Sequence, residues 1–292
     1  MTILPRTLRI IGALLAAAAL VSCSAIKLGY SAVDDMAYLW LDGYLGFSDE
    51  QGARVRDDLQ RLHTWHRTQE LPRVADLLGR MEQLAPHTLT PVQVCAFVPE
   101  LQARLMAIAD QAEPAVVRTA LSLTPRQLRH LQRKSGENNR KWREEWIDIP
   151  PGALKEKRFK QVVDRLEMIY GTLDEAQRAV LRAGLERSVF DPQRTLVERQ
   201  RRQSDLQQIL QRLAGSQTPL PEARAALRGY LERSLRAPDP GYRAYQQAQQ
   251  EESCQLIAAV HAAASPAQRE QAARRLRAYQ RDLRELSGAA AS

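Results

Sequence analysis

Apolar residues recur along the chain at intervals of three and four, the spacing that places side chains on one face of an α-helix. Leu59 and Leu62 follow this pattern, and so do Val162, Val163 and Leu166. The alternation that marks a half-buried strand is not sustained anywhere for long. The pattern therefore predicts helices and no sheet.

Prolines and glycines divide this pattern into eleven helical segments. A proline cannot continue the interior of a helix, so we expect a break at Pro72, among other positions, and the clearest loop at residues 238–241. The expected helices cover residues 31–44, 48–71, 73–85, 90–121, 124–147, 152–171, 173–190, 192–214, 219–236, 239–262 and 265–286.

A short motif that starts a helix occurs five times. An apolar residue is followed by Ser, Thr or Asp, and glutamine stands three positions after the hydroxyl or carboxylate. The first side chain can cap free backbone amides and the glutamine can bond back to the capping residue, which makes a capping box. The five pairs are Ser48 and Gln51, Thr90 and Gln93, Thr124 and Gln127, Asp174 and Gln177, and Ser265 and Gln268.

The composition agrees with a helical fold. The chain has 292 residues, only 14 glycines and 5% aromatic residues, and residues of high helix propensity dominate. We expect an all-α protein, an irregular multi-helix bundle or array of about 9–11 helices. It should form a single helical domain over residues 31–286, followed by a flexible C-terminal tail over residues 287–292.

The N-terminus has the order of a secretory signal. Arg6 and Arg9 precede an apolar run over residues 10–20. A helix needs about 20 apolar residues to cross a bilayer, so we expect this shorter run to be removed. Cys23 follows the small residue Ser22, and residues 20–23 (Leu-Val-Ser-Cys) resemble the lipobox of bacterial lipoproteins.

This resemblance implies that residues 1–22 are a cleaved signal peptide and that Cys23 is lipidated. In that family the cysteine carries a diacylglyceryl group and an acylated amine (palmitate), and several acyl chains anchor a protein stably where one does not. Ser24 stands where aspartate would retain a lipoprotein, which implies the outer membrane, with the protein facing the periplasm. Residues 23–30 would form the lipidated N-terminus and a short tether.

Lipidation would leave Cys95 and Cys254 as an even pair in an oxidising compartment. We expect a disulfide between them. In the chain-entropy model, a loop of this length gives about 5 kcal/mol of stabilisation. The bridge would also connect the N-terminal part of the chain to the C-terminal part.

The net charge of +8 would ordinarily point to nucleic acid. Export removes that partner, so we expect none. A basic face could meet anionic headgroups or cell-wall carboxylates, or it could be a solvated surface without a specific ligand.

One pair of tryptophans could line a binding groove. Trp142 and Trp146 lie four residues apart, so both rings point to the same side of a helix. Together with Asn138, Asn139 and Arg143 they could line a groove for a peptide or a glycan. Alternatively, the two rings are core aromatics that clamp the helix.

A second aromatic stretch, residues 30–51, also has two interpretations. Its tyrosines and its tryptophan are interleaved with aspartates and come soon after the lipid site. The rings could lie against lipid headgroups, where Tyr and Trp are common, or the stretch could be the first core helix.

No catalytic residue, cofactor or metal is expected. The sequence lacks the G-x-S-x-G, H-E-x-x-H and C-x-x-C motifs and a glycine-rich phosphate loop. His63, His66 and Glu70 share one helix face, but a zinc site would need a further ligand. Local hydrogen bonding beside Trp65 is the alternative.

Three family resemblances concern function. The five helix starts resemble the LTxxQ repeats of periplasmic stress chaperones, whose helices form a cradle for unfolded clients. Arg187, Phe190 and Asp191 match part of the R-x-x-F-D motif of lipase-specific foldases, although Pro192 stands where that motif has tyrosine. Residues 30–51, the lipobox, the pair Trp65-His66 and residues 70–72 resemble a family of uncharacterised Gram-negative lipoproteins, a domain of unknown function.

We therefore expect a lipid-anchored, periplasm-facing helical protein that is not an enzyme and acts through protein–protein interaction in the cell envelope. The membrane, through the N-terminal lipid, and another envelope protein are its expected partners. The alternatives are a general periplasmic chaperone or envelope-stress protein that binds unfolded clients, and a steric chaperone similar to the lipase foldases. The sequence leaves the oligomeric state open.

Overall fold

The computed structural model describes residues 27–288 of the chain. The expected signal peptide, Cys23, the first residues of the expected tether and the last four residues of the expected tail lie outside the described residues. In the part described, helices connected by short loops form the whole fold and no strand is present. The prediction of an all-α protein is confirmed.

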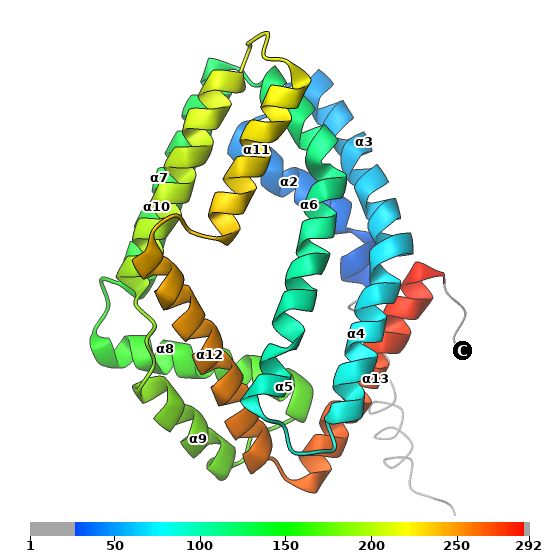
Figure 1. Cartoon of the computed structure of the whole chain (residues 1–292), viewed down its shortest axis with the longest axis vertical. Coiled ribbons are helices and arrows are strands. Elements are labelled where there is room, and N and C mark those ends of the chain that lie inside the picture. The colour runs from blue at the N-terminus through cyan, green and yellow to red at the C-terminus, as the bar shows by residue number, and fades with distance from the viewer. Residues whose placement is uncertain (1–26, 289–292) are drawn as a thin grey trace, which may run out of the picture.

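Each of the eleven expected segments has a helical counterpart (Figure 1). A helical turn over residues 27–31 leads into the first labelled helix. The helices are α2 (Val33–Leu45), α3 (Asp49–Trp65), the π-helical segment η1 (His66–Glu70), α4 (Leu71–Leu84), α5 (Pro91–Cys95), α6 (Phe97–Ser122), α7 (Pro125–Trp146), α8 (Pro151–Tyr170), α9 (Glu175–Glu186), α10 (Pro192–Leu213), α11 (Leu220–Leu235), α12 (Pro240–Ala263) and α13 (Pro266–Ser287).

The break expected at Pro72 is wrong, because α3, η1 and α4 follow one another without a loop. A proline removes one N–H donor and collides with the carbonyl four residues earlier. Here the Leu71 amide bonds to the His66 carbonyl, five residues back. This wider turn accommodates the proline without ending the helix. Conversely, the segment expected over residues 90–121 is divided at Ala96 into α5 and α6.

The five capping boxes are confirmed. At each predicted start, the capping side chain accepts from the backbone amide of the glutamine, and the glutamine side chain accepts from the backbone amide of the capping residue. Each of these five helices therefore begins at a residue whose close neighbours in the sequence provide hydrogen-bond partners for backbone amides at the helix start.

Four of these boxes meet in two pairs, which the sequence did not indicate. The Gln127 side-chain amide donates to the Gln51 carbonyl oxygen at 2.7 Å, and Gln51 donates back at 3.4 Å. The Gln268 amide donates to the Gln177 carbonyl oxygen at 2.6 Å. Each pair joins the N-termini of two helices that are far apart in the sequence, α3 with α7 and α9 with α13.

Two hydrophobic cores lie toward opposite ends of the molecule (Figure 1). The first core, from α6, α7, α10 and α11, consists of Val117, Ala120, Leu123, Leu128, Ile209, Leu210, Leu213, Ala223 and Leu227. The second core, mainly from α8, α9, α12 and α13, consists of Ala85, Phe159, Val163, Tyr170, Leu173, Leu181, Leu185, Val260, Ala264, Ala272 and Ala273.

Helices that contact both ends connect the two cores. The stretch from α3 through η1 to α4 runs from one end toward the other, and α13 packs along α4 (Figure 1). The Cys95 and Cys254 sulfurs lie 2.05 Å apart, in agreement with the expected disulfide, and this pair ties α5 to α12. The helices consequently close into a loop in which α6 has α5 and α12 at its start and the first core at its end.

Candidate binding pocket

An apolar pocket of about 580 Å³ lies beside the first core. Its walls come from α2, α3 and α6, and α7, α10 and α11 close it from the other side. The Trp40 and Tyr44 rings of α2 line the pocket, with their centroids 4.7 Å apart and their planes tilted by 47°. Ala112 and Ala115 of α6 also line the pocket, and their side chains are single methyl groups. Small side chains on α6 therefore leave room that the neighbouring helices do not fill.

A smaller hollow of about 170 Å³ adjoins the pocket. Leu59 and Leu62 of α3 line both, so the two form one continuous apolar surface along α3. The smaller hollow extends to Val33 at the start of α2 and to Ile108 of α6.

The charges at the rim of the pocket are largely paired. Asp58 accepts from Arg61 at 2.6 Å and from Arg118 at 2.7 Å. One carboxylate thus meets two guanidinium groups, which leaves one net positive charge at the rim. The three side chains form one ion-paired cluster beside the apolar walls.

A tyrosine–histidine pair lies in the smaller hollow. The Tyr30 hydroxyl and His66 Nδ1 are 2.9 Å apart, and the Tyr30 ring meets the His63 ring edge-on at 4.7 Å. Burial raises the pKa of Tyr30 to about 12 and lowers the pKa of His66 below its ordinary value. Both groups are therefore neutral at neutral pH and suit an apolar surrounding.

One face of α6 is apolar and exposed, although the helix packs against the first core on its other side. Residues 91–122, which include α5 and α6, are long and apolar enough to cross a membrane, and none of the most apolar window is buried. Leu105 is 62% exposed and Val116 is 47% exposed. Such a face ordinarily has a covering partner.

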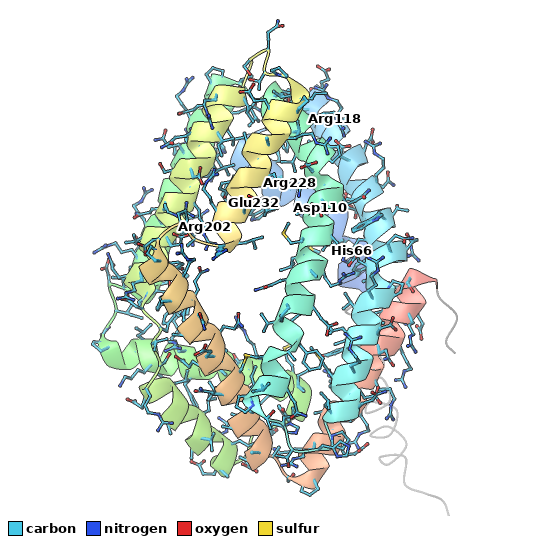
Figure 2. The ribbon with its side chains drawn as sticks, viewed as in Figure 1. His66, Asp110, Arg118, Arg202, Arg228 and Glu232 are labelled. Atoms are coloured by element: carbon cyan, nitrogen blue, oxygen red, sulfur yellow. A yellow bond between two sulfur atoms is a disulfide. The ribbon has the colours of Figure 1, made fainter. Side chains whose placement is uncertain are left out.

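Ion pairs with α11 hold α6 against the first core (Figure 2). Arg228 donates to Asp110 at 2.8 Å, and Arg224 donates to Glu113 at 2.5 Å. The hydrogen bond from Arg224 holds the pKa of Glu113 below its ordinary value. Glu113 is consequently ionised at neutral pH, and the two ion pairs fix α6 to the body of the protein.

The structure places the tryptophan pair of α7 away from this pocket. The Trp142 and Trp146 rings stack at 5.2 Å, and the Trp142 indole N–H donates to the Pro192 carbonyl at 3.2 Å. Trp146 meets Phe190 edge-on at 5.9 Å, and the Lys157 ammonium lies 4.3 Å from its ring centroid. Both half-buried rings lie at the junction of α7, α8 and α10.

The polar residues proposed to accompany the tryptophans point elsewhere. Asn138 bonds to the Tyr44 hydroxyl, and Asn139 exchanges hydrogen bonds with Gln203 at 2.7 and 3.2 Å. Tyr44 and Gln203 line the apolar pocket, so the asparagines support its wall from behind. Arg143 is exposed and forms an ion pair at 3.2 Å with Asp148, just beyond α7.

His63, His66 and Glu70 do not converge. His63 faces Asp34 at 3.6 Å, whereas the buried Glu70 accepts from Arg73 at 2.8 Å. No group of three metal-binding side chains is present among residues 27–288. Each of these side chains has a local partner instead.

Two residues of the foldase-like motif also serve local structure. The Asp191 side chain caps α10 by accepting from two backbone amides. Phe190 lies under the Arg158 guanidinium at 4.5 Å and against Trp146. Arg187 ends α9.

Sequence reasoning missed the pocket, although one signal was available. The face of α6 that meets the pocket carries Ala112 and Ala115 in a helix that also contains an internal proline, Pro114. A row of small side chains opposite bulky ones on α2 indicates unfilled space, but only if the two helices are known to face each other.

The fold defines an all-α protein with two hydrophobic cores and an apolar pocket beside the first of them. The family model for a family of unknown function, DUF6279, matches residues 43–223, more than half of the chain, and the chain belongs to that family. No curated protein and no solved structure matches the chain.

Proposed function

We propose that this protein is a lipoprotein of the bacterial envelope that acts by binding rather than by catalysis. The acylated Cys23 would anchor it in the outer membrane, facing the periplasm. Its partner would be another envelope protein that inserts an apolar, helical segment into the pocket between α2, α3 and α6. The observation that carries this proposal is the 580 Å³ apolar pocket beside α6, a helix whose most apolar window is not buried.

Several features of the pocket fit such a partner. Apolar walls with few polar groups are typical of grooves that receive the apolar face of a helix. The net positive charge left by Asp58, Arg61 and Arg118 would favour an acidic residue at the edge of the incoming segment. The disulfide from α5 to α12 and the ion pairs from α11 hold α6 in place, which reduces the ordering cost of binding.

Site-specific photocrosslinking in intact cells tests the proposal. A photoreactive residue at Val116, 47% exposed on the pocket wall, is compared with one at Val197, 58% exposed on α10 and outside the pocket. We expect one or two envelope proteins to be captured at Val116 and not at Val197. Equal capture at both positions would contradict a pocket-directed interaction. Mass spectrometry of the purified protein tests the acyl groups on Cys23 separately.

A chaperone function is a second candidate, favoured by the exposed apolar face of α6. In that case Val116 would capture many unrelated envelope proteins, more of them after heat or ethanol. The same two crosslinking positions therefore distinguish a dedicated partner from unfolded clients.

A further inference from the structure

The helix nearest the lipid site, α2, has two different faces. Tyr38 is buried, and its hydroxyl occupies the space that a side chain at Gly52 would need, since a Cβ there would lie 2.7 Å from it. The Arg56 guanidinium lies 3.7 Å from the centroid of the Tyr38 ring. This face makes α2 part of the folded body and fixes its orientation.

Exposed apolar side chains lie along the opposite face of α2 and at Leu28 in the turn before it, and two of them, Val33 and Trp40, also reach the smaller hollow and the pocket, respectively. We call this set the α2 stripe; it consists of Leu28, Val33, Met36, Leu39 and Trp40, exposed by 70, 39, 51, 68 and 62%. These five are among fifteen exposed large apolar side chains in the described part of the chain, yet they lie within thirteen consecutive residues. The spacing from residue 33 to residue 40 keeps them on one side of the helix. So concentrated an apolar surface indicates a partner.

The position of the α2 stripe in the chain indicates what kind of partner covers it. Lys27 is the first described residue and lies four residues after Cys23. Four extended residues span at most about 14 Å. Lys27 is also held to α13 through Glu285 and Asp282. If Cys23 is buried in a bilayer by its acyl chains, Lys27 cannot be farther than this from the lipid surface, and the α2 stripe begins at the next residue, Leu28.

We propose that the α2 stripe lies in the lipid interface, parallel to the membrane plane, so that phospholipid is its partner. This inference rests on the lipid anchor of the proposed function. Tryptophan is favoured at the boundary between headgroups and acyl chains, where Trp40 would lie. The stripe itself contains no cation, and its exposed charged neighbour is Asp35. Apolar burial therefore drives the contact, which should be insensitive to salt.

Fluorescence quenching in vesicles tests this contact. The lipidated protein is reconstituted in vesicles of phosphatidylethanolamine and phosphatidylglycerol whose acyl chains carry bromine, a quencher of nearby tryptophan. We expect quenching that is lost in Trp40→Phe and kept in Trp65→Phe. It should be unchanged between about 0.05 and 0.5 M salt, a range over which exposed charges become largely screened.

A matched pair of charge substitutions separates an effect specific to the α2 stripe from the general effect of placing a charge on the protein surface. Leu39→Asp and Val197→Asp both alter exposed side chains, so both should fold, as circular dichroism would verify. Leu39→Asp should reduce the quenching of Trp40, whereas Val197→Asp should leave it unchanged. Equal quenching in both variants would overturn the proposal.

Other outcomes distinguish a failure of this membrane contact from a failure of the lipid anchor in the proposed function. Acylated protein whose Trp40 is not quenched would overturn the membrane contact and leave the proposed function standing. If Leu39→Cys then forms a disulfide between two copies, the α2 stripe is an interface between copies of this chain. Protein without acyl groups on Cys23 would overturn the anchor, and with it the inference.

Discussion

The first core borders a pocket of about 580 Å³, whereas the second core encloses Leu181 and His261 with almost no exposure to solvent. The two regions otherwise have two structural features in common. Each has a pair of capping boxes joined through glutamines, and each has a tyrosine hydroxyl bonded to a histidine Nδ1, at 2.9 Å for Tyr30 and 2.8 Å for Tyr170.

The comparison shows that the second region buries its apolar surface, whereas the first leaves part of its apolar surface exposed. In the second core, His261 bonds through Nε2 to the His87 carbonyl at 2.7 Å, and carbonyls only accept, so the neutral ring is satisfied at both nitrogens. In the first region the corresponding His66 lies in a hollow beside the larger pocket. Apolar surface left unburied there is available for a partner.

The largest expected effect comes from the disulfide between α5 and α12. Replacing both Cys95 and Cys254 with alanine should lower the free energy of unfolding by up to about 5 kcal/mol, because the bridge closes a loop with a sequence separation of 159 residues. Chemical denaturation measures the loss. Hydrogen exchange should accelerate more in α6 than in α9; the reverse would mean that the second core depends on the bridge more than the first.

A leucine pair compares the packing of the two cores. Leu181→Ala, in the filled core, should cost about 4 kcal/mol of unfolding free energy, whereas Leu210→Ala, which borders the pocket, should cost about 2 kcal/mol. The difference arises because a side chain beside a hollow has fewer contacts to lose. Equal losses in urea titrations would show that the pocket is closed in solution.

The two glutamine pairs should couple with different strengths. Double-mutant cycles with alanine should give about 1 kcal/mol between Gln51 and Gln127, which exchange two hydrogen bonds, and less between Gln177 and Gln268, which share one. Stronger coupling in the second pair would contradict this. Thermal unfolding of the four single and two double variants, compared with the unsubstituted protein, gives the free energies of unfolding for the two cycles.

Acid should destabilise the second core through His261. Burial lowers the pKa of His261 below the value of about 6.5 expected in the unfolded chain. The stabilisation is complete above pH 6.5 and is lost as the pH falls toward the lower folded-state pKa. His261→Gln should flatten this part of the stability profile more than His66→Gln, because His261 is the more buried ring. Denaturation series between about pH 7 and 5 measure the two slopes.

The smallest effect on stability is expected from filling the pocket. Ala115→Phe should change the free energy of unfolding by less than about 1 kcal/mol, since the ring enters empty space, and should abolish crosslinking at Val116. The matched substitution Ala273→Phe, in the second core, should cost about 1–3 kcal/mol through overpacking. A large loss from Ala115→Phe would contradict an open pocket.

Local sequence determined much of this fold. The capping boxes at residues such as Thr124 and Asp174 act within four residues, so their order in the sequence predicts the helix starts directly. The pairing of Gln51 with Gln127 depends on which helix ends meet, and no local signal carries that information. The pocket escaped prediction for the same reason, because Ala115 becomes informative only when it is known to line the same pocket as Trp40.

The stretch from α3 through η1 to α4 has a mechanical consequence. At about 1.5 Å per residue, residues 49–84 form a strut of roughly 50 Å that reaches from the pocket to the second core. Its wide π turn lies part-way along, where the buried Glu70 of η1 meets Arg104 of α6 at 3.3 Å. A twist imposed at the pocket would be carried along this strut, and the π turn is the place where its pitch could change without breaking the helix.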